Sequence, residues 1–266
     1  MLRQERLNRI CEVVETDGLA TVAALSRQLG VSQMTIRRDL QELDAHGFLR
    51  RTHGGALPPE RHRGLIEPPV LERMQENAEL KRLLGRATAD RILPSEAIFL
   101  GSGTTTLAVA QALAAHPKTL TVFTNALTIA NALAAIREIT LVVVGGFLRR
   151  SELSLVGHLA EAAVRDIRVD RVIMGMRGID PEKGLTSDYI QELKTDQAIL
   201  GMGGSVIIVA DHTKFGHVAT SRTAPVEAAS LIITDDRAPR PLVEAIQARG
   251  VEVILVGDSG GGPEAA

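Results

Sequence analysis

The sequence predicts an α/β fold in two parts: a small helical N-terminal domain that ends in a hairpin, and a larger domain built on a mostly parallel sheet. Three observations predict it. Apolar residues recur at helical spacing from residue 7 to residue 43, a segment rich in proline and charge follows, and short β-branched runs then alternate with segments rich in alanine and leucine. We expect the small domain over 1–57, a linker over 58–70, the large domain over 71–257, and a disordered glycine-rich tail over 258–266.

Two short helices open the small domain. The first is indicated by apolar residues at helical spacing, namely Leu7, Ile10, Cys11 and Val14. The second begins at Thr21 and has its apolar positions at Val22, Leu25 and Leu29. Gly30-Val31 then forms a tight turn. Because Cys11 falls among apolar positions and is the only cysteine, we expect a small buried side chain there and no internal disulfide.

A third helix follows the turn, with Ser32 as the cap of its first turn. At about 100° per residue, one face of this helix is apolar and the opposite face is polar. The apolar face has Ile36, Leu40 and Leu43, and the opposite side has Met34, Arg38 and Gln41, flanked by Thr35 and Arg37. Asp39 lies nearer the apolar side, so we expect it to hold the domain together through an arginine of a neighbouring helix. Two short helices joined by a glycine turn, the second of them basic on its outer face, are typical of a DNA-binding helix-turn-helix.

Residues 48–56 predict a small hairpin after the third helix, in which Gly54-Gly55 is expected to adopt turn conformations unavailable to other residues. Such a wing places basic side chains along the DNA backbone or in the minor groove. Arginine bonds bidentately to guanine or clamps phosphates, and glutamine pairs with adenine. The candidate DNA contacts are Ser32, Gln33, Thr35, Arg37, Arg38, Gln41, Arg50, Arg51 and His53. The alternative is a charged face that is only solvated.

The composition of the whole chain sets further limits. The chain has 266 residues, with 30 lysines and arginines against 32 aspartates and glutamates, so the net charge of −2 gives no general basic footprint. No apolar run is long enough to span a bilayer and the N-terminus lacks a signal-peptide core, so we expect a cytoplasmic protein without membrane contact. The seven histidines and the single cysteine show no metal-ligand spacing, so neither a metal nor a cofactor is expected.

The large domain is predicted to begin with a helix over residues 71–93, with Leu80, Leu83 and Leu84 on its apolar stripe. Apolar runs rich in β-branched residues then predict strands over 98–100, 121–124, 140–144, 171–174, 205–210, 231–234 and 251–256. The segments between them predict helices over 106–115, 127–135, 159–167, 189–200 and 241–249. Such alternation indicates a doubly wound or related α/β domain, with helices on both faces of a mostly parallel sheet.

One junction of this domain is suited to a phosphate. The loop Gly101-Ser102-Gly103-Thr104-Thr105-Thr106 follows a predicted strand and opens a helix. Its backbone N–H groups lie at the positive end of the helix dipole, beside several hydroxyls. No lysine follows the glycines as in a Walker loop, and the three-glycine dinucleotide fingerprint is missing, so nucleoside triphosphates are not the expected ligand.

Other strands of the large domain also end in polar or glycine-bearing loops. Asn125 ends one strand, Gly145-Gly146 the next, and Asp211 through Lys214 a later one. Lys214 is suited to pair with a phosphate, while Asp211 and Asn125 are suited to bond sugar hydroxyls. Taken singly, each loop also has a structural explanation, since threonines cap helices, glycines form turns and Asp211 can simply start a loop.

The sequence resembles the DeoR family of bacterial transcriptional regulators over nearly the entire chain outside the linker and the tail. At the N-terminus the resemblance rests on Arg6, Ile10 and Val14, followed by Ser32 and residues 35–40, and on the wing at 51–56. In the large domain it rests on the strings GSGTT, TN and GG, and then on Val156-Gly157, Val169-Asp170, residues 178–180, residues 184–186 and residues 211–215, in that order.

The resemblance implies a fold related to ribose-5-phosphate isomerase and coenzyme A transferases, and sensing of phosphorylated sugars or related metabolites. It implies effector contacts at Ser102, Gly103, Thr104, Thr105, Thr106, Asn125, Gly145, Gly146, Thr186, Glu192, Asp211 and Lys214. Two positions depart from the family's pattern. Many members carry an aspartate where this chain has Gly101, and a lysine where it has Asp196; Lys194 is close but in a different register.

The leading hypothesis is therefore a repressor of a carbohydrate-metabolism operon, acting as a dimer or larger homo-oligomer, whose affinity for double-stranded operator DNA changes when a sugar phosphate binds. An oligomer is expected because one small DNA-binding domain makes few base contacts, and paired half-sites in the operator increase their number. The alternative is a sugar-phosphate isomerase-like enzyme, with Glu192, Asp211 and Lys214 as acid–base groups. A third hypothesis, a DNA-bound architectural protein without a ligand, leaves the polar loops of the large domain unexplained.

Overall fold

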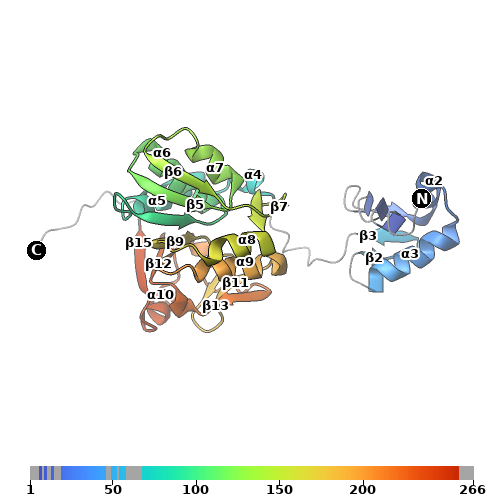
Figure 1. Cartoon of the computed structure of the whole chain (residues 1–266). Helices are drawn as coiled ribbons and strands as arrows, with labels where there is room; N and C mark the ends of the chain where they lie inside the picture. Colours follow the sequence, from blue (N-terminus) through green and yellow to red (C-terminus); the bar gives the residue numbers. More distant parts are fainter. Residues whose placement is uncertain are drawn as a thin grey trace, which may run out of the picture. The chain divides into compact units, whose positions relative to one another are not determined.

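The computed structural model describes residues 6–7, 9–10, 13–14, 19–45, 49–52, 54–57 and 68–257. The chain divides into two compact units, Met1–Glu67 and Pro68–Ala266 (Figure 1). The predictions made for Cys11, for His53, for the linker over 58–67 and for the tail over 258–266 lie outside the described residues. In the described part of the chain, no helix combines the length and apolar character needed to cross a bilayer.

The small unit is a helix-turn-helix with a wing, as the sequence predicted. Its elements with described bounds are β1 (Ala20–Thr21), α2 (Val22–Leu29), α3 (Gln33–Ala45), β2 (Arg50–Arg51) and β3 (Gly55–Leu57), and the strands form an antiparallel sheet in the order β1-β3-β2. Thr21 caps α2 by accepting a 3.1 Å hydrogen bond from Ala24 N, and Gly30 ends it in the left-handed conformation at φ 66°. The core is aliphatic and includes Leu7, Ile10, Val14, Leu25, Ile36, Leu40, Leu43, Leu49 and Ala56.

The glycine pair of the wing has a different role from the predicted one. Neither Gly54 nor Gly55 has a positive φ, so the expectation of special turn conformations was wrong. Gly55 instead pairs with Thr21 across the sheet, and a Cβ at Gly55 would overlap the carbonyl oxygen of Ala20. A glycine is required there because β1 and β3 approach too closely for any side chain.

The large unit is built on a seven-stranded parallel sheet in the order β15-β14-β12-β9-β4-β5-β6. The strands are β4 (Ala97–Leu100), β5 (Leu120–Thr124), β6 (Ile139–Val143), β9 (Arg171–Met174), β12 (Ser205–Val209), β14 (Leu231–Asp235) and β15 (Glu252–Val256). Every neighbouring pair is parallel. The prediction of a mostly parallel α/β domain is confirmed.

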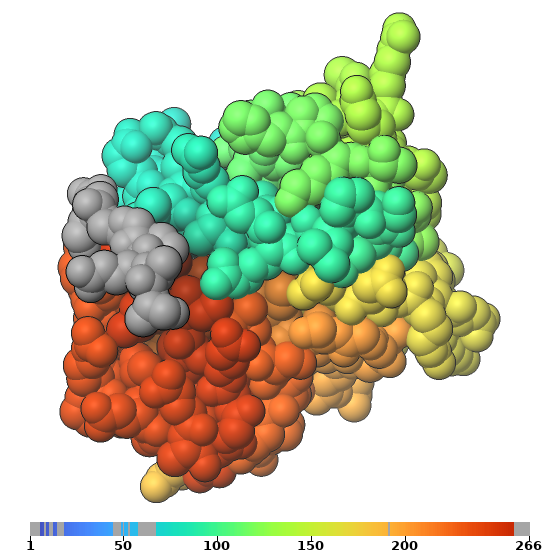
Figure 2. All heavy atoms as spheres, turned by 90° about the vertical axis from the view of Figure 1, so that its left-hand side faces the viewer, coloured from blue at the N-terminus to red at the C-terminus, as the bar shows by residue number. Residues whose placement is uncertain are grey.

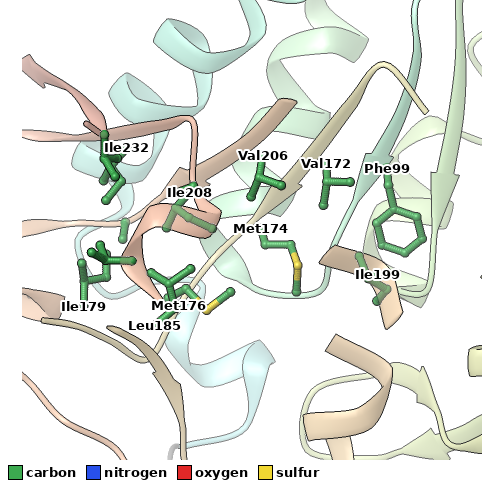
Figure 3. Packing of buried hydrophobic residues seen from close by; sticks show 14 of the residues in the cluster. Phe99, Val172, Met174, Met176, Ile179, Leu185, Ile199, Val206, Ile208 and Ile232 are labelled. Atoms are coloured by element: carbon green, nitrogen blue, oxygen red, sulfur yellow. The ribbon is translucent and has the colours of Figure 1, made fainter. Parts of the chain in front are cut away.

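Helices cover both faces of this sheet (Figure 1). Ile98 and Leu100 of β4 pack in one apolar cluster with the helices α5 (Ala78–Ala89), α6 (Thr104–Ala115) and α7 (Leu127–Leu133). Phe99, between them in sequence, packs on the other face with α8 (His158–Arg165), α9 (Ile190–Leu200) and α10 (Arg240–Gln247). Because successive side chains of a strand point to opposite faces, β4 contributes to both cores. Figure 3 shows the second core around Phe99, Met174 and Ile199.

The first predicted helix of this unit is two helices. The short α4 (Val70–Arg73) is separated from α5 by a turn that ends at Asn77, whose φ of 49° is left-handed. Helix α5 then covers β14 and β15, and the teal atoms of α5 lie beside the red atoms of the C-terminal strand in Figure 2. Gly85 of α5 allows close packing on α6, because a Cβ there would overlap the backbone of Ala108.

Short antiparallel strands complete the unit, and the sequence analysis missed them. The hairpin β7 (Phe147–Arg149) and β8 (Ser154–Val156) follows β6. The strands β10 (Gly178–Asp180), β11 (Gly184–Ser187) and β13 (Ser221–Ala224) form a separate sheet. Residues 178–186 therefore form a hairpin, in which Asp180 accepts hydrogen bonds from Glu182 N and Lys183 N.

Candidate DNA interface and effector site

Helix α3 buries one face and exposes the other, as its spacing predicted. Ile36, Leu40 and Leu43 are buried in the core of the small unit. The exposed side chains are Ser32, Gln33, Met34, Arg37, Arg38 and Gln41, with Thr35 half-buried beside them. Ser32 Oγ accepts a 3.1 Å hydrogen bond from Thr35 N, which confirms the predicted cap. An exposed helix face with two arginines and two glutamines can read base edges in the major groove.

A buried ion pair ties this helix to the first one. Arg6 Nε lies 2.6 Å from Asp39 Oδ2, and Arg6 Nη2 lies 3.2 Å from Asp39 Oδ1. Asp39 is 2% exposed, and its hydrogen bond raises the pKa of Arg6. The expected role of Asp39, holding the domain together through an arginine of a neighbouring helix, is confirmed.

The wing places one described basic side chain in solvent. Arg51 is exposed on β2, and its backbone N–H donates to Asp44 Oδ1 at 3.1 Å, which fixes the wing against the end of α3. Arg50 is the other residue of β2. His53 lies outside the described residues, so its predicted DNA contact stays a prediction.

The second candidate site lies at the carboxyl edge of the parallel sheet. From β4 the chain moves outward through β5 and β6, and it returns to pair β9 with the other side of β4. Ligands of open α/β sheets bind at such a switch point, outside the carboxyl ends of the two strands. Gly101 N donates to Ile173 O at 2.9 Å, which ties the loop after β4 to β9 at this point.

The loop after β4 has the geometry of a phosphate cradle. Gly103 has a φ of 127°, which suits glycine alone, and it directs the chain into the 12-residue helix α6. Thr106 Oγ1 donates to Gly103 O at 2.9 Å, and Thr104 is buried, so these two threonines shape the loop. Ser102 and Thr105 are half-buried and stand beside the N-terminal N–H groups of α6. A Cβ at Gly101 would lie 3.1 Å from Met174 Cγ, so the departure from aspartate at this position fits the packing of Met174.

Three charged groups meet at the next part of the same edge. Asp211 is buried and accepts a 2.9 Å hydrogen bond from Thr213 N and another from Thr213 Oγ1, so it caps the short helix at His212–Lys214. Lys81 of α5 is buried, and its Nζ donates to Arg73 O at 2.7 Å. Burial lowers the pKa of Lys81, while the nearby Asp211 opposes this shift and Lys214 adds to it. Lys214 is half-buried and adds a second positive charge near Lys81, so this corner is suited to an anion.

Lys81 is not among the site residues predicted from the sequence. The predicted apolar stripe of this helix comprises Leu80, Leu83 and Leu84 and does not include Lys81. The signal was available, because Lys81, Leu84, Gly85 and Thr88 share one helix face, and all four are buried. A lysine in the middle of a buried face is a candidate binding group, because its ammonium loses hydration there and the carbonyl of Arg73 accepts only one of its three N–H bonds.

Glu192 is held by two partners from the β7–β8 hairpin. Its carboxylate accepts hydrogen bonds from Arg149 Nη1 and, at 2.6 Å, from Ser154 Oγ. The Arg149 guanidinium also stacks 3.5 Å from the centre of the Tyr189 ring. Asp196 lies one turn further along α9, and burial, followed by the charge of Glu192, raises its pKa well above the ordinary value. Glu192, one of the predicted effector contacts, therefore belongs to a network in which the positive charge of Arg149 offsets only part of the negative charge of Glu192 and Asp196.

Of the remaining predicted contacts, Asn125, Gly145 and Gly146 follow strands of the parallel sheet, and Thr186 lies in a separate sheet. Asn125 is buried after β5, with Nδ2 donating to Leu155 O at 3.1 Å and Oδ1 buried without a partner. Gly145 is exposed, and Gly146 approaches the backbone of Val156 too closely for a Cβ. Thr186 lies in the separate small sheet, where its Oγ1 accepts from Ala219 N at 2.9 Å. The structure therefore gives Thr186 a structural partner.

Asp235 anchors the loop that carries Asp211 and Lys214. It accepts hydrogen bonds from His212 N at 2.7 Å, from His212 Nδ1 at 3.0 Å and from Arg237 Nε at 2.9 Å. Burial acts to raise the pKa of Asp235, but these hydrogen bonds outweigh it and lower the pKa. Among the described residues, no group of three or more histidine, cysteine or acidic side chains has the arrangement of a metal site.

Comparison with known proteins identifies the two units. Residues 6–62 match the DeoR-like helix-turn-helix domain, and residues 76–236 match the DeoR C terminal sensor domain. The chain belongs to the DeoR family. The wing and the recognition helix therefore lie in the DNA-binding domain of this family, and the parallel sheet with its polar edge is the sensor domain.

Relatives of this DeoR-family chain align along nearly its full length. The putative aga operon transcriptional repressor of Escherichia coli O157:H7 is 32% identical over 96% of this chain and 94% of its own. The glycerol-3-phosphate regulon repressor of Escherichia coli K12 is 30% identical over 96% and 100%, and the transcriptional repressor AccR of Agrobacterium fabrum is 33% identical over 91% and 93%. The ribose 5-phosphate isomerase A of Methanocaldococcus jannaschii aligns over 53% of this chain and 55% of its own, at 14% identity and a TM-score of 0.39, which is too distant to bear on function.

The raised pKa of Asp196 predicts a pH-dependent cost to stability in the sensor domain. The folded state binds this proton more tightly than the unfolded state, so stability is lost as the pH rises from the unfolded pKa of about 3.9 through the folded pKa. Asp196→Asn keeps the side chain neutral, so we expect it to be more stable than the wild type at neutral pH, with a gap that closes in acid. Urea midpoints measured from about pH 4 to pH 7 test this, with the exposed Asp90→Asn as control. A gap that is constant with pH contradicts it.

Proposed function

We propose that this chain represses transcription of a carbohydrate-metabolism operon and that a phosphorylated sugar or related metabolite, bound at the carboxyl edge of the sensor sheet, changes its affinity for the operator. The observation that carries the proposal is the joint occurrence of an exposed arginine-bearing recognition helix and an anion-suited corner around Lys81 and Lys214. The relatives named above are repressors, one of them of the glycerol-3-phosphate regulon.

The effector is inferred from the charges at the sheet edge. The N-terminus of α6 and the half-buried Lys214 favour a phosphate, with Ser102 and Thr105 supplying hydroxyl donors. The buried Oδ1 of Asn125 is an acceptor without a partner, which suits a sugar hydroxyl. We retain Gly103, Thr104, Thr106, Gly145, Gly146, Glu192 and Asp211 as residues that shape or line this site.

Two copies of the chain are expected to act together on one operator. A single recognition helix reads a few base pairs, and paired half-sites multiply the specificity. The effector must bind the two conformations of the assembly with different affinity, because a ligand that binds both equally does not shift the equilibrium between them. We propose that effector binding relieves repression.

Catalysis by the sensor domain is disfavoured by the partners of its acidic groups. The Glu192 carboxylate accepts hydrogen bonds from Arg149 and Ser154, and the Asp211 carboxylate accepts them from Thr213. These partners give both carboxylates structural roles, Asp211 as a helix cap and Glu192 as the ion-pair partner of Arg149. We therefore propose a binding function for this edge, and isomerisation of ribose 5-phosphate by the pure protein that is lost in Glu192→Ala would overturn that part of the proposal.

The proposal is tested by fluorescence anisotropy of the full chain on the DNA upstream of its own gene, with random DNA as control and a panel of sugar phosphates added in turn. Specific binding that one compound releases supports the whole proposal. Specific binding that no compound changes contradicts the effector part alone. Equal affinity for both DNAs contradicts the repressor function.

Replacing Arg38 or Arg51 by alanine is expected to change DNA binding in different ways. If Arg38 bonds a base edge, Arg38→Ala weakens specific binding by about 1–3 kcal/mol and leaves random DNA nearly unaffected. If Arg51 holds a phosphate, Arg51→Ala weakens both DNAs similarly and lowers the slope of log affinity against log salt by about 1. Salt titrations of both variants on both DNAs measure this. An equal loss on the two DNAs for Arg38→Ala refutes base reading.

A further inference from the structure

Exposed apolar side chains gather at one end of the sensor sheet. Val142 and Val143 of β6 are 36% and 43% exposed, and Phe147 and Leu148 of β7 are 58% and 45% exposed. We call these four residues the edge surface. Residues 139–148, which include all of them, carry no charged side chain. Val142 and Val143 are successive residues of one strand, so they expose apolar side chains on both faces of the sheet at its end. Exposed apolar residues clustered at one place can mark a surface that another molecule covers.

The strand beneath this surface is an open edge. Strand β6 is the last of the seven strands and pairs with β5 alone, in regular register from Leu120–Ile139 to Thr124–Val143. Natural proteins protect such edges with lysines, prolines, bulges or a covering element. Within the described sheet β6 has no lysine, no proline and no bulge, so its outer backbone groups are free to pair with another strand.

We propose that the edge surface binds a second copy of this chain, with β6 of the two copies side by side and antiparallel across a two-fold axis. This inference rests on the proposed function, because a paired operator requires two heads and therefore a second copy. The chemistry of the strand favours the same occupant. A two-fold axis places an uncharged apolar strand against an identical one, so no charge is buried without a partner, whereas a charged partner would lose hydration here.

The edge surface is joined to the effector site through a single hairpin. Phe147 and Leu148 precede Arg149 on β7, and Arg149 and Ser154 hold the buried carboxylate of Glu192. Figure 1 shows this hairpin beyond the ends of β5 and β6. An anionic effector that competes with Glu192 for Arg149 therefore acts on the hairpin that carries half of the edge surface. The proposed contact gives the effector a route to the spacing of the two heads.

Sedimentation of the full chain at micromolar concentration tests the proposal, with Val142→Lys on the strand and Leu148→Glu on the hairpin as two independent variants. Val218→Lys is the matched control, because Val218 is an exposed valine (48%) away from β6 and β7. We expect both edge variants to have half the mass of the wild type and Val218→Lys to keep the wild-type mass. Circular dichroism confirms that each variant is folded. A monomeric wild type, or folded edge variants with the wild-type mass, overturns the proposal.

Operator binding measured on the same samples separates this inference from the proposed function. If the wild type binds its operator specifically while the edge variants keep the wild-type mass, the interface is wrong and the repressor function stands. If the edge variants dissociate but the wild type has no specific DNA affinity, the interface stands and the repressor function fails. When both proposals are correct, dissociation of the copies lowers operator affinity at least tenfold, because two linked heads bind more tightly than one.

Discussion

Asp39→Ala is expected to unfold the DNA-binding domain under conditions in which the sensor domain stays folded. Asp39 is 2% exposed and forms two hydrogen bonds to Arg6, at 2.6 and 3.2 Å. Removing one member of a buried ion pair costs about 3–5 kcal/mol, and because the Arg6 side chain is 12% exposed, this value is an upper limit here. A domain of this size has a total stability of only about 5 kcal/mol or less, so the loss consumes most of it.

Hydrogen exchange measured by mass spectrometry reads this effect separately in the two units. Peptides from α3 should lose protection in Asp39→Ala, while peptides from β4 and β9 keep theirs. The double variant Arg6→Met with Asp39→Leu is the control, because replacing both charges by apolar side chains removes the uncompensated charge and should restore most of the protection. Unchanged protection of α3 in Asp39→Ala, or no recovery in the double variant, contradicts the assigned role of the pair.

Local patterns in the sequence predicted most of the fold for physical reasons that are visible in particular elements. The strand at Arg171–Met174 has the predicted bounds because a buried parallel strand is a short run of apolar residues, and α3 shows the 3.6-residue repeat of a helix with one buried face. The β7–β8 hairpin and the β10–β11–β13 sheet were missed. Their strands have three or four residues, too few to show a period, and their partners are set by tertiary contacts.

The candidate sites were predictable to different degrees for a similar reason. The face of α3 follows from spacing within one helix, and so does the Ser32 cap. The partner of Glu192 does not, because Arg149 is 43 residues away in sequence and only the fold brings them together. Lys81 is an intermediate case. Its position on a buried helix face could be predicted from spacing, but its nearby carboxylate, Asp211, comes from a loop that is distant in sequence.

Lys81→Met is expected to abolish most of the effector response while leaving operator binding without effector unchanged. The Lys81 ammonium is buried near Asp211 and Lys214, at the corner proposed to bind the anionic effector. A charge-assisted hydrogen bond to a phosphate contributes about 1.5–3 kcal/mol, so the half-saturating concentration of effector should rise by roughly 10- to 150-fold. Methionine keeps the length of the side chain and removes the cost of burying a charge, so the domain should not lose stability.

Lys118→Met is the matched control for Lys81→Met. Lys118 Nζ also donates to backbone carbonyls next to α5, those of Ala89 at 2.9 Å and Ile92 at 2.7 Å, but it lies at the opposite end of that helix. If lysine contacts to α5 matter only for folding, both variants should shift the unfolding midpoint and neither should change the effector titration. If Lys81 binds the anion, only Lys81→Met changes the titration, and Lys214→Ala should change it in the same direction. A normal response in both Lys81→Met and Lys214→Ala would place the effector elsewhere in the sensor domain, because no anion could then depend on the charges that meet at this corner.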